Sequence, residues 1–334
     1  MKRFISLGII TVLLFILTGC SYSSSEISPA FFTESQTDTG TAGYSYADDY
    51  SFKYLNRTFD FLYHDICFVT EDIIPDDSYA FTASAAACYS INDGRVIYAS
   101  GIFDKVYPAS ITKLMTAYLC IRYANMEDVA YISEDNCGIT TAGAQLCGFK
   151  AGDSITVQDL LYCLLVYSGN DAAVAIAEHV SGSTQDFVRL MNSTAEELGA
   201  IDSHFTNPHG LNEPNHYTTA YDMYLVFNAC LKYESLVSVL STQGHDVTIT
   251  HADGTVDTLY MEPTNLYFTG QYTAPAGLYV VGGKTGSTIA AGNCLILYSV
   301  NDSNEGFITE LFGCADKKTL YNEMNELLDM CGAD

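Results

Sequence analysis

Positive charge is scarce in this sequence. Its 334 residues include 14 lysines and arginines against 40 aspartates and glutamates, a formal net charge of −26 at pH 7. A surface this acidic repels nucleic acids and anionic lipid headgroups. We therefore expect no nucleic-acid partner. Hydrophobic residues, at 48%, are plentiful enough for one large or two modest folded domains.

Structural zinc is also disfavoured, because none of the 11 cysteines forms a Cys-x-x-Cys pair. Six cysteines lie in apolar helical or strand-like patterns, where a free thiol behaves as a small core residue: Cys88, Cys120, Cys163, Cys230, Cys294 and Cys314. Cys137 and Cys147 flank a loop rich in glycine and threonine, and a disulfide bond, if one forms, is expected between these two.

Apolar runs long enough to span a membrane are missing too. The run over residues 4–17 follows a basic start and is short for a span, so residues 1–20 are predicted to be an export signal. The signal ends in Leu17-Thr18-Gly19-Cys20, which resembles the lipobox of bacterial lipoproteins. That resemblance implies cleavage before Cys20 and attachment of two or three acyl chains to it, which anchor a protein stably. An ordinary signal peptide is the alternative.

Residues 21–50 contain no lysine or arginine and are rich in serine, threonine, aspartate and glycine. Such a segment buries too little to fold alone, and we interpret it as a flexible tether. A flexible chain of about 30 residues has an end-to-end distance on the order of 30 Å, enough to lift a domain off a membrane. Residues 51–334 are predicted to form one domain, with its core beginning near residue 79.

Strand patterns lie at both ends of this domain, and helical patterns lie between them. Strands are predicted over residues 83–89, 95–99, 278–281, 293–300 and 306–312, the first two joined by a tight Asp-Gly turn. Helices are predicted from Ser110, after Thr156, over residues 171–182 and 183–199, and near the C-terminus around Leu320. The order predicts an α+β domain, in which an antiparallel sheet built from both termini is flanked by a helical subdomain.

Ser110 and Lys113 stand three residues apart in YPASITKLMTAYLC, at the start of an apolar helical pattern. Residues at i and i+3 lie on one helix face, about 5–6 Å apart at Cβ, so the amine can reach the hydroxyl. A serine needs such a base because its own proton stays on at neutral pH. The lysine serves only if its pKa falls, which a helix N-terminus and a second cation both favour. For this motif alone, a surface hydroxyl beside a charge is the alternative.

Two more motifs follow along the chain. Ser168-Gly169-Asn170 falls between two predicted helices, but Ser-x-Asn is weak by itself, since Ser90-Ile91-Asn92 and Ser299-Val300-Asn301 match it as turn residues. Lys284-Thr285-Gly286 follows a predicted strand and a Gly282-Gly283 pair. Glycines beside a cation let a substrate backbone approach, and the lysine can hold a carboxylate. A glycine-rich turn with a solvated lysine is the alternative.

Ser-x-x-Lys, Ser-x-Asn and Lys-Thr-Gly in this order resemble the active-site signature of penicillin-binding proteins and serine β-lactamases. The flanking stretches DLLYCLLVYSGNDAAVAIAE, FTNPHGL, HYTTAYDM and GGKTGST resemble the D-alanyl-D-alanine carboxypeptidases among the low-molecular-mass penicillin-binding proteins. The resemblance covers about residue 83 to the C-terminus. It implies the β-lactamase/DD-peptidase-like fold and a serine carboxypeptidase that removes the terminal D-alanine from peptidoglycan stem peptides through an acyl-enzyme.

The resemblance also implies roles for individual residues. Ser110 is the expected nucleophile, Lys113 its general base, and Ser168 the relay that brings a proton to the leaving amine. The expected substrate-binding residues are Asn170, Lys284, Thr285, Gly286 and Ser287. Among these, Asn170 holds the peptide group, while Lys284 and Thr285 bind the terminal carboxylate and steady the relay hydroxyl. The backbone N–H groups of Ser110 and Ser287 form the oxyanion hole.

The sequence departs from the family pattern in two places. Many relatives carry a β-rich C-terminal domain, which we do not expect here because the sequence ends soon after its last predicted helix. Some relatives recruit an arginine to the substrate carboxylate from beyond the Lys-Thr-Gly strand, whereas no arginine follows Arg189 here. The carboxylate is then left to Lys284, Thr285 and Ser287.

Three histidines, His204, His209 and His216, lie near Asp202 and Glu213, but their spacing fits no zinc-ligand pattern. We expect no metal and no cofactor. His209 and His216 fall inside the family-like stretches and are expected to order the loop below the active site.

Two other functions share the same motifs. A β-lactamase needs a carboxylate to hydrolyse its acyl-enzyme, and class A enzymes place a glutamate four residues before an asparagine, whereas Glu213 is followed at that spacing by Tyr217. A non-catalytic penicillin-binding sensor lipoprotein keeps the fold without turnover, but all three motifs are intact here. We therefore expect an extracytoplasmic lipoprotein of the cell membrane that faces the cell wall, acts on stem peptides and is inhibited covalently by β-lactam antibiotics.

Overall fold

The structure, a computed structural model, describes residues 66–75 and 81–332. The predicted export signal, the predicted lipidation site Cys20 and the predicted tether of residues 21–50 lie outside the described residues. Within them, no single helix has the length and apolarity to cross a membrane, although the bent pair Ala220–Cys230 and Glu234–Leu240 does by length and composition alone. The segment 66–75 already packs on the domain, ahead of the core start predicted near residue 79, since the buried Cys67 donates its N–H to the Tyr224 hydroxyl.

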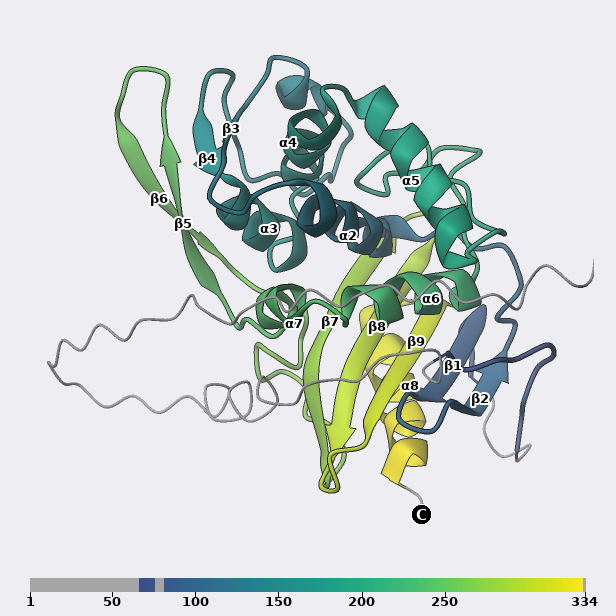
Figure 1. Ribbon diagram of the computed structural model, residues 1–334. Coiled ribbons are helices and arrows are strands. Elements are labelled where there is room, and N and C mark those ends of the chain that lie inside the picture. The colour runs from purple at the N-terminus through teal and green to yellow at the C-terminus, as the bar shows by residue number, and fades with distance from the viewer. Residues whose placement is uncertain (1–65, 76–80, 333–334) are drawn as a thin grey trace, which may run out of the picture. The chain divides into compact units, whose positions relative to one another are not determined.

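The larger sheet has five antiparallel strands in the order β2-β1-β9-β8-β7. Its strands are β1 Ala85–Ser90, β2 Arg95–Ser100, β7 Leu278–Thr288, β8 Gly292–Asn301 and β9 Gly306–Cys314. Strand β1 pairs with β9 along its whole length, from Ala85 opposite Phe312 to Ser90 opposite Phe307. The prediction of a sheet built from the two ends of the domain is therefore confirmed (Figure 1).

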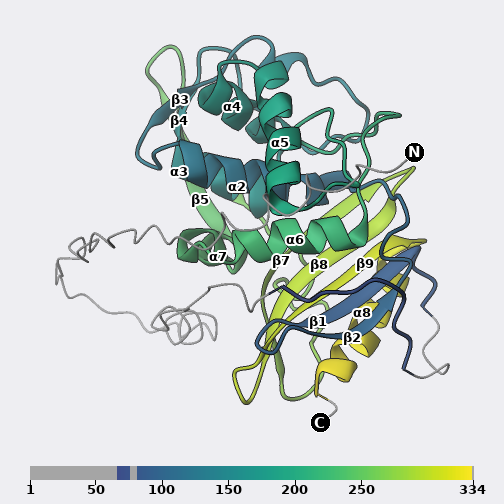
Figure 2. The same ribbon diagram turned by 45° about the vertical axis from the view of Figure 1, so that its right-hand side comes forward.

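Helices cover both faces of this sheet. Helix α8, Lys317–Asp329, packs on one face, where Leu295, Leu297 and Leu311 of the strands meet Leu320, Met324 and Leu327 of the helix. The other face carries the larger apolar cluster, in which Ile296 and Ile308 lie among residues of the remaining helices. Figure 2 shows α8 and α6 on opposite sides of the sheet. Alternate residues of each strand thus serve two separate cores.

The helical subdomain lies on the α6 side. Its helices are α2 Lys113–Tyr123, α3 Val157–Leu165, α4 Asn170–Ser181, α5 Thr184–Leu198, α6 Ala220–Cys230 and α7 Glu234–Leu240. The predicted caps are confirmed: the side chains of Thr156 and Ser183 accept hydrogen bonds from the third residue beyond them, Asp159 and Asp186. Gly182 ends α4 in the left-handed region, at φ 76°, where glycine carries no Cβ penalty.

A second, four-stranded sheet was not foreseen from the sequence. It consists of β3 Val129–Tyr131, β4 Ser154–Thr156, β5 His245–Thr250 and β6 Val256–Met261, in that spatial order. A histidine clamp joins the β5–β6 turn to the residue before β4: the His251 ring bonds Asp153 through Nδ1 at 2.8 Å and Asp257 through Nε2 at 2.9 Å. Hydrogen bonds first to Asp257 and then to Asp153 raise the pKa of His251.

The disulfide expected between Cys137 and Cys147 is wrong: neither is bonded, and the two thiols face different neighbours. The Cys137 thiol faces the carbonyl oxygens of Ser133 and Phe149, each 3.5 Å away. The Cys147 thiol instead lies against the backbone of Gly169. Nearness along a loop did not determine which way either sulfur points. The six cysteines predicted to be core residues are buried.

Candidate active site

The nucleophile candidate Ser110 lies in a short 3-10 turn, η1 Ala109–Thr112, which runs directly into α2 at Lys113. The α-helix predicted from Ser110 therefore begins three residues later. Ala109 adopts a left-handed backbone conformation, with φ 46°, which an alanine takes only under constraint from its surroundings. The turn leaves the Ser110 side chain half-buried at a pocket, whereas Lys113 behind it is completely buried.

Lys113 makes three hydrogen bonds from its amine. Its Nζ lies 2.9 Å from the Ser110 hydroxyl, 2.7 Å from Oδ1 of Asn170 and 2.8 Å from the carbonyl oxygen of His209. A lysine ammonium has three donors, so all of them are used. Burial and then the positive charge of Lys284 hold the pKa of Lys113 well below its usual value, although Cys147 and Asp171 oppose the shift. The amine thus has the environment that a general base requires.

Ser168 and Asn170 project from the corner between α3 and α4. Ser168 is buried and left-handed, with φ 70°, and Asn170 is the first residue of α4. The corner is held by the next residue, Asp171, whose carboxylate accepts the backbone N–H groups of Cys147 and Gly148, both at 2.9 Å. The backbone N–H of Asn170 also donates to the Gln145 carbonyl at 2.8 Å. The loop over residues 143–148 is thereby fixed against the Ser-x-Asn corner.

Lys284, Thr285 and Gly286 lie within β7 rather than after it, so the glycine-rich turn considered as an alternative is wrong. The buried Lys284 Nζ donates to the Ser168 hydroxyl at 2.9 Å and to the carbonyl oxygen of Thr285. Burial lowers the pKa of Lys284 to about 7. A Cβ on Gly286 would lie 3.0 Å from the backbone nitrogen of Ser110, so glycine lets the edge strand β7 run directly beside the nucleophile.

The Gly282-Gly283 pair has a different role from the one predicted. A Cβ on Gly282 would meet Leu240 of α7 at 3.0 Å, and one on Gly283 would lie 2.3 Å from the Ile296 carbonyl oxygen of β8. These glycines admit neighbouring elements of the fold, not a substrate backbone. They let β7 pack closely against α7 and β8.

These groups surround one pocket of about 330 Å³. Six of the eight predicted catalytic and substrate-binding residues line it directly: Ser110, Ser168, Asn170, Thr285, Gly286 and Ser287. The other two, Lys113 and Lys284, lie behind them and reach the lining hydroxyls by hydrogen bonds. The loop residues 143–145 form one wall, and Lys317 and Tyr321 of α8 contribute to another. The structure thus brings all eight residues together.

The loop below Ser110 is ordered by two histidines, as expected. His216 pairs its Nε2 with the Thr112 hydroxyl at 2.8 Å, and the His209 carbonyl oxygen contacts Lys113. Burial lowers the pKa of His209 to about 3 and that of His216 to about 4, so both rings are neutral at pH 7. The sequence did not indicate that the backbone carbonyl of His209, rather than its ring, contacts Lys113. Only tertiary structure could reveal that contact.

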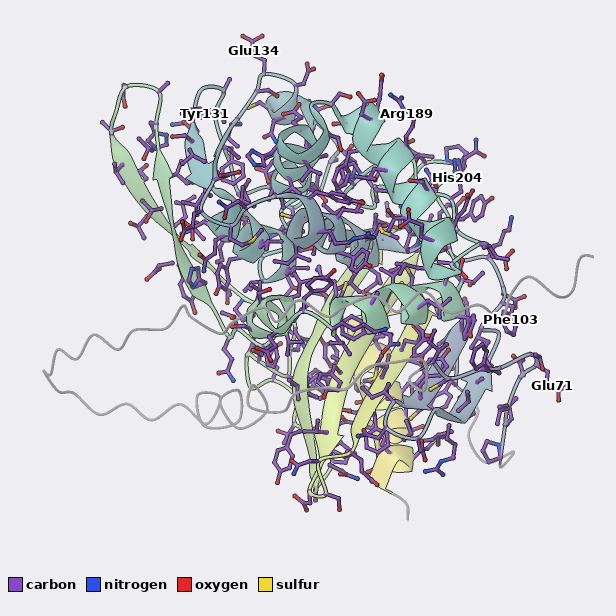
Figure 3. The ribbon with its side chains drawn as sticks, viewed as in Figure 1. Glu71, Phe103, Tyr131, Glu134, Arg189 and His204 are labelled. Carbon is purple, nitrogen blue, oxygen red and sulfur yellow. The ribbon has the colours of Figure 1, made fainter. Side chains whose placement is uncertain are left out.

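No arginine lines the pocket among the described residues. Arg189, the last arginine in the sequence, lies on α5 and pairs with Asp186 one turn away. Figure 3 shows Arg189 and His204 at the outer surface on the α5 side. Lys317 is the exposed cation among the pocket-lining residues, and the sequence analysis did not identify it.

Comparisons with known proteins agree with this geometry. A family model described as D-alanyl-D-alanine carboxypeptidase, Peptidase S11, matches residues 73–313. The D-alanyl-D-alanine carboxypeptidase DacF of Bacillus subtilis is 33% identical over 270 residues, which cover 78% of this chain and 65% of the relative. DacC of Escherichia coli is 28% identical over 276 residues, covering 80% and 65%. The chain therefore spans slightly less than two thirds of the length of these relatives.

Solved structures share the fold. The Streptomyces K15 DD-transpeptidase superposes with a TM-score of 0.70 at 23% identity, covering 76% of this chain and 98% of its own. The D-alanyl-D-alanine carboxypeptidase DacD from Francisella tularensis gives a TM-score of 0.66 at 25% identity, with 79% and 74% covered. The predicted DD-peptidase-like fold is confirmed by these similarities.

Proposed function

Because this chain belongs to the Peptidase S11 family of D-alanyl-D-alanine carboxypeptidases, we propose that it is a serine carboxypeptidase that removes the terminal D-alanine from peptidoglycan stem peptides. The observation that carries the proposal is two sets of hydrogen bonds that meet at one pocket. One branch joins Asn170, Lys113 and Ser110, and the other joins Lys284 to Ser168. Together they offer a nucleophile, a buried amine base and a second hydroxyl that can carry a proton.

The contacts of Lys113 assign the direction of the first proton transfer. A neutral amine has two N–H groups and one lone pair, and the lone pair must face a donor. The carbonyl oxygens of Asn170 and His209 can only accept, so the Ser110 hydroxyl is the one neighbour able to donate to the lone pair. Deprotonation of Lys113 therefore turns the Ser110 hydrogen bond around and prepares the hydroxyl for attack.

In the proposed reaction, Ser110 Oγ bonds to the carbonyl carbon of the penultimate D-alanine while Lys113 takes its proton. The backbone N–H groups of Ser110 and Ser287 stabilise the oxyanion. Collapse of the tetrahedral intermediate breaks the peptide bond, and the proton that Lys113 took passes through the Ser168 hydroxyl to the departing amine of D-alanine, which leaves Lys113 neutral again. Water then attacks the carbonyl carbon of the ester while Lys113 takes a proton from it. Breakage of the ester bond returns that proton to Ser110 and releases the shortened stem peptide.

The substrate carboxylate is proposed to lie beside β7. Thr285 and Ser287 point to the same face of the strand, because successive side chains of a strand alternate. Asn170 holds the peptide group from the opposite wall. Lys284 supports this arrangement from behind, through its hydrogen bond to Ser168.

A β-lactam follows the same first step and leaves a covalent acyl-enzyme, which we propose as the mode of inhibition. The β-lactamase alternative gains no support, because none of the described residues that line the pocket carries a carboxylate. Glu213 instead accepts a hydrogen bond from the Asn207 side chain at 3.1 Å.

The test uses the full chain with diacetyl-L-lysyl-D-alanyl-D-alanine, and follows D-alanine release with and without benzylpenicillin. Release that penicillin blocks and Ser110→Ala abolishes is the expected result. Unchanged release from Ser110→Ala refutes the assignment of the nucleophile. Rapid turnover of penicillin favours the β-lactamase, and slow acylation with no D-alanine release favours the sensor.

We also propose that Cys20 is lipidated and that the tether of residues 21–50 holds the domain outside the cell membrane, facing the wall. The export pattern of residues 1–20 and a substrate that lies beyond the membrane support this location. Metabolic labelling with a radioactive fatty acid, compared between the native chain and Cys20→Ser, is the test. Equal label in both proteins refutes the anchor.

A further inference from the structure

Two buried thiols from opposite ends of the described chain meet beside the five-stranded sheet. Cys88 lies in β1 and is fully buried, and Cys331 lies in the 3-10 turn η3 Met330–Gly332, which directly follows α8. Their Sγ atoms are 3.0 Å apart. A disulfide bond is about 2.05 Å long, so an approach of roughly 1 Å separates this contact from a covalent bond.

The surroundings favour one partner for each sulfur. Both residues belong to the apolar cluster between the sheet and α8, together with Leu311 and Leu327. Besides Cys88, the Cys331 thiol has one hydrogen-bond partner among the described residues, the Leu327 carbonyl oxygen at 3.7 Å. Neither sulfur has a charged neighbour within hydrogen-bond distance among the described residues. A weak thiol–thiol contact in this apolar layer contributes little, whereas a bond would fix α8 to β1.

We propose that Cys88 and Cys331 form a disulfide bond in the folded protein. The thiolate of one cysteine attacks an external disulfide, forms a mixed disulfide and releases one thiol. The second cysteine then attacks the mixed disulfide, forms the Cys88–Cys331 bond and releases the second external thiol. Two protons and two electrons leave the protein, and the external disulfide is reduced to two thiols.

The bond links residues that are 243 positions apart. It secures the far end of α8, the helix whose first turns contribute Lys317 and Tyr321 to the pocket. Cys88 is inaccessible in the native state, so the bond forms during folding rather than after it. Its presence in the cell rests on the proposed export, because oxidising compartments lie outside the cytoplasm. The chemistry itself does not depend on the proposed peptidase activity.

The test refolds the full chain from denaturant either in a mixture of oxidised and reduced glutathione or in dithiothreitol. Free thiols are alkylated after denaturation, and peptides are mapped by mass spectrometry. Cys331→Ala removes one partner, and Cys137→Ala is the matched control because its thiol has no sulfur neighbour among its described contacts. Penicillin labelling of Ser110 reports folding in every sample, independently of D-alanine release.

We expect a Cys88–Cys331 cross-linked peptide in glutathione and none in dithiothreitol. The melting temperature should rise by at least about 5 °C on oxidation, since closing a loop this long restricts the unfolded chain. Cys137→Ala keeps both effects and Cys331→Ala loses both. Recovery of Cys88 and Cys331 as separately alkylated peptides from the glutathione sample overturns the proposal. A redox-dependent melting shift that persists in Cys331→Ala also overturns it.

Discussion

Replacing Gly210 by alanine tests how closely the loop below the nucleophile is fitted to it. Gly210 has φ +89°, and a Cβ there would lie 1.8 Å from the carbonyl oxygen of Ala109 and 2.9 Å from the Thr112 hydroxyl. Both neighbours belong to the turn that carries Ser110. The residue before Gly210 is His209, whose carbonyl oxygen accepts from Lys113.

The expected size of the effect follows from this geometry. Real Cβ contacts are essentially never below 3.0 Å, so the loop and the turn must separate by about 1.2 Å. A misplacement of about 1 Å in an active site costs on the order of 10²-fold in rate. The left-handed conformation adds roughly 1–2 kcal/mol of strain for any residue with a Cβ.

Gly254→Ala is the matched control, since Gly254 has φ +85° but no atom within 4 Å of the point where a Cβ would lie. Both variants carry the left-handed strain, and only Gly210→Ala also disturbs the nucleophile. Stopped-flow acylation by a fluorescent penicillin should therefore slow about 10²-fold in Gly210→Ala and remain near the native rate in Gly254→Ala. Acylation rates within threefold of each other would refute the reasoning.

Four further results are expected. Lys113→Arg keeps a positive charge that cannot be lost, so penicillin acylation should fall on the order of 10²–10⁴-fold, and a loss below tenfold assigns the base elsewhere. Lys284→Gln removes the cation that lowers the pKa of Lys113, so the acidic limb of the acylation pH profile should move to higher pH; an unmoved midpoint contradicts this coupling. Ser168→Gly and Ser168→Ala both lose the hydroxyl, but glycine tolerates φ 70°, so Ser168→Gly should be more stable in urea unfolding by roughly 1 kcal/mol; equal stabilities argue against strain there. The pKa of His251 is raised in the folded protein, so its hydrogen bonds to Asp153 and Asp257 stabilise the fold below the unfolded pKa of about 6.5, and this stabilisation is lost as pH rises through the folded pKa. In His251→Gln the melting temperature should therefore depend less on pH between pH 6 and 9; a pH dependence equal to that of the native protein shows that the histidine clamp does not contribute to stability.

The motifs could be predicted because their information is local. The spacing of Ser110 and Lys113 predicted a hydroxyl within reach of an amine, and their atoms lie 2.9 Å apart. The 3-10 form of the turn was not predictable, since Ala109 is constrained by Gly210 and Gly286, which are distant in sequence. Likewise, Lys284 meets Ser168 across 116 positions, and no spacing rule reports such a contact.

The missed elements have a physical explanation as well. Helix α6 is buried over almost its entire surface, so its sequence lacks the polar stripe that identifies an amphipathic helix. In strand β5, polar and apolar residues alternate over only a few positions, because Val247 and Ile249 are its two buried residues and threonines stand beside them. So short an alternation is a weak signal for a strand. The prediction of a Cys137–Cys147 disulfide failed for a different reason, because the two positions lie near each other along a loop but their thiols face different neighbours.

The strand order also determines when the residues of the pocket can first come together during folding. β9 is the last strand along the chain, yet it lies between β1 and β8 and so joins the half that carries Ser110 to the half that carries Lys284. Pairing β9 with β1 requires closing a long loop, and the entropy lost in closing it is offset only after the strands have paired. The pairing of β1 with β9 is therefore a late folding event. A chain that has emerged only as far as β8 holds its nucleophile and base but has no strand to connect its sheet halves. The two halves of the sheet that carry the pocket residues are therefore joined only when the central strand inserts.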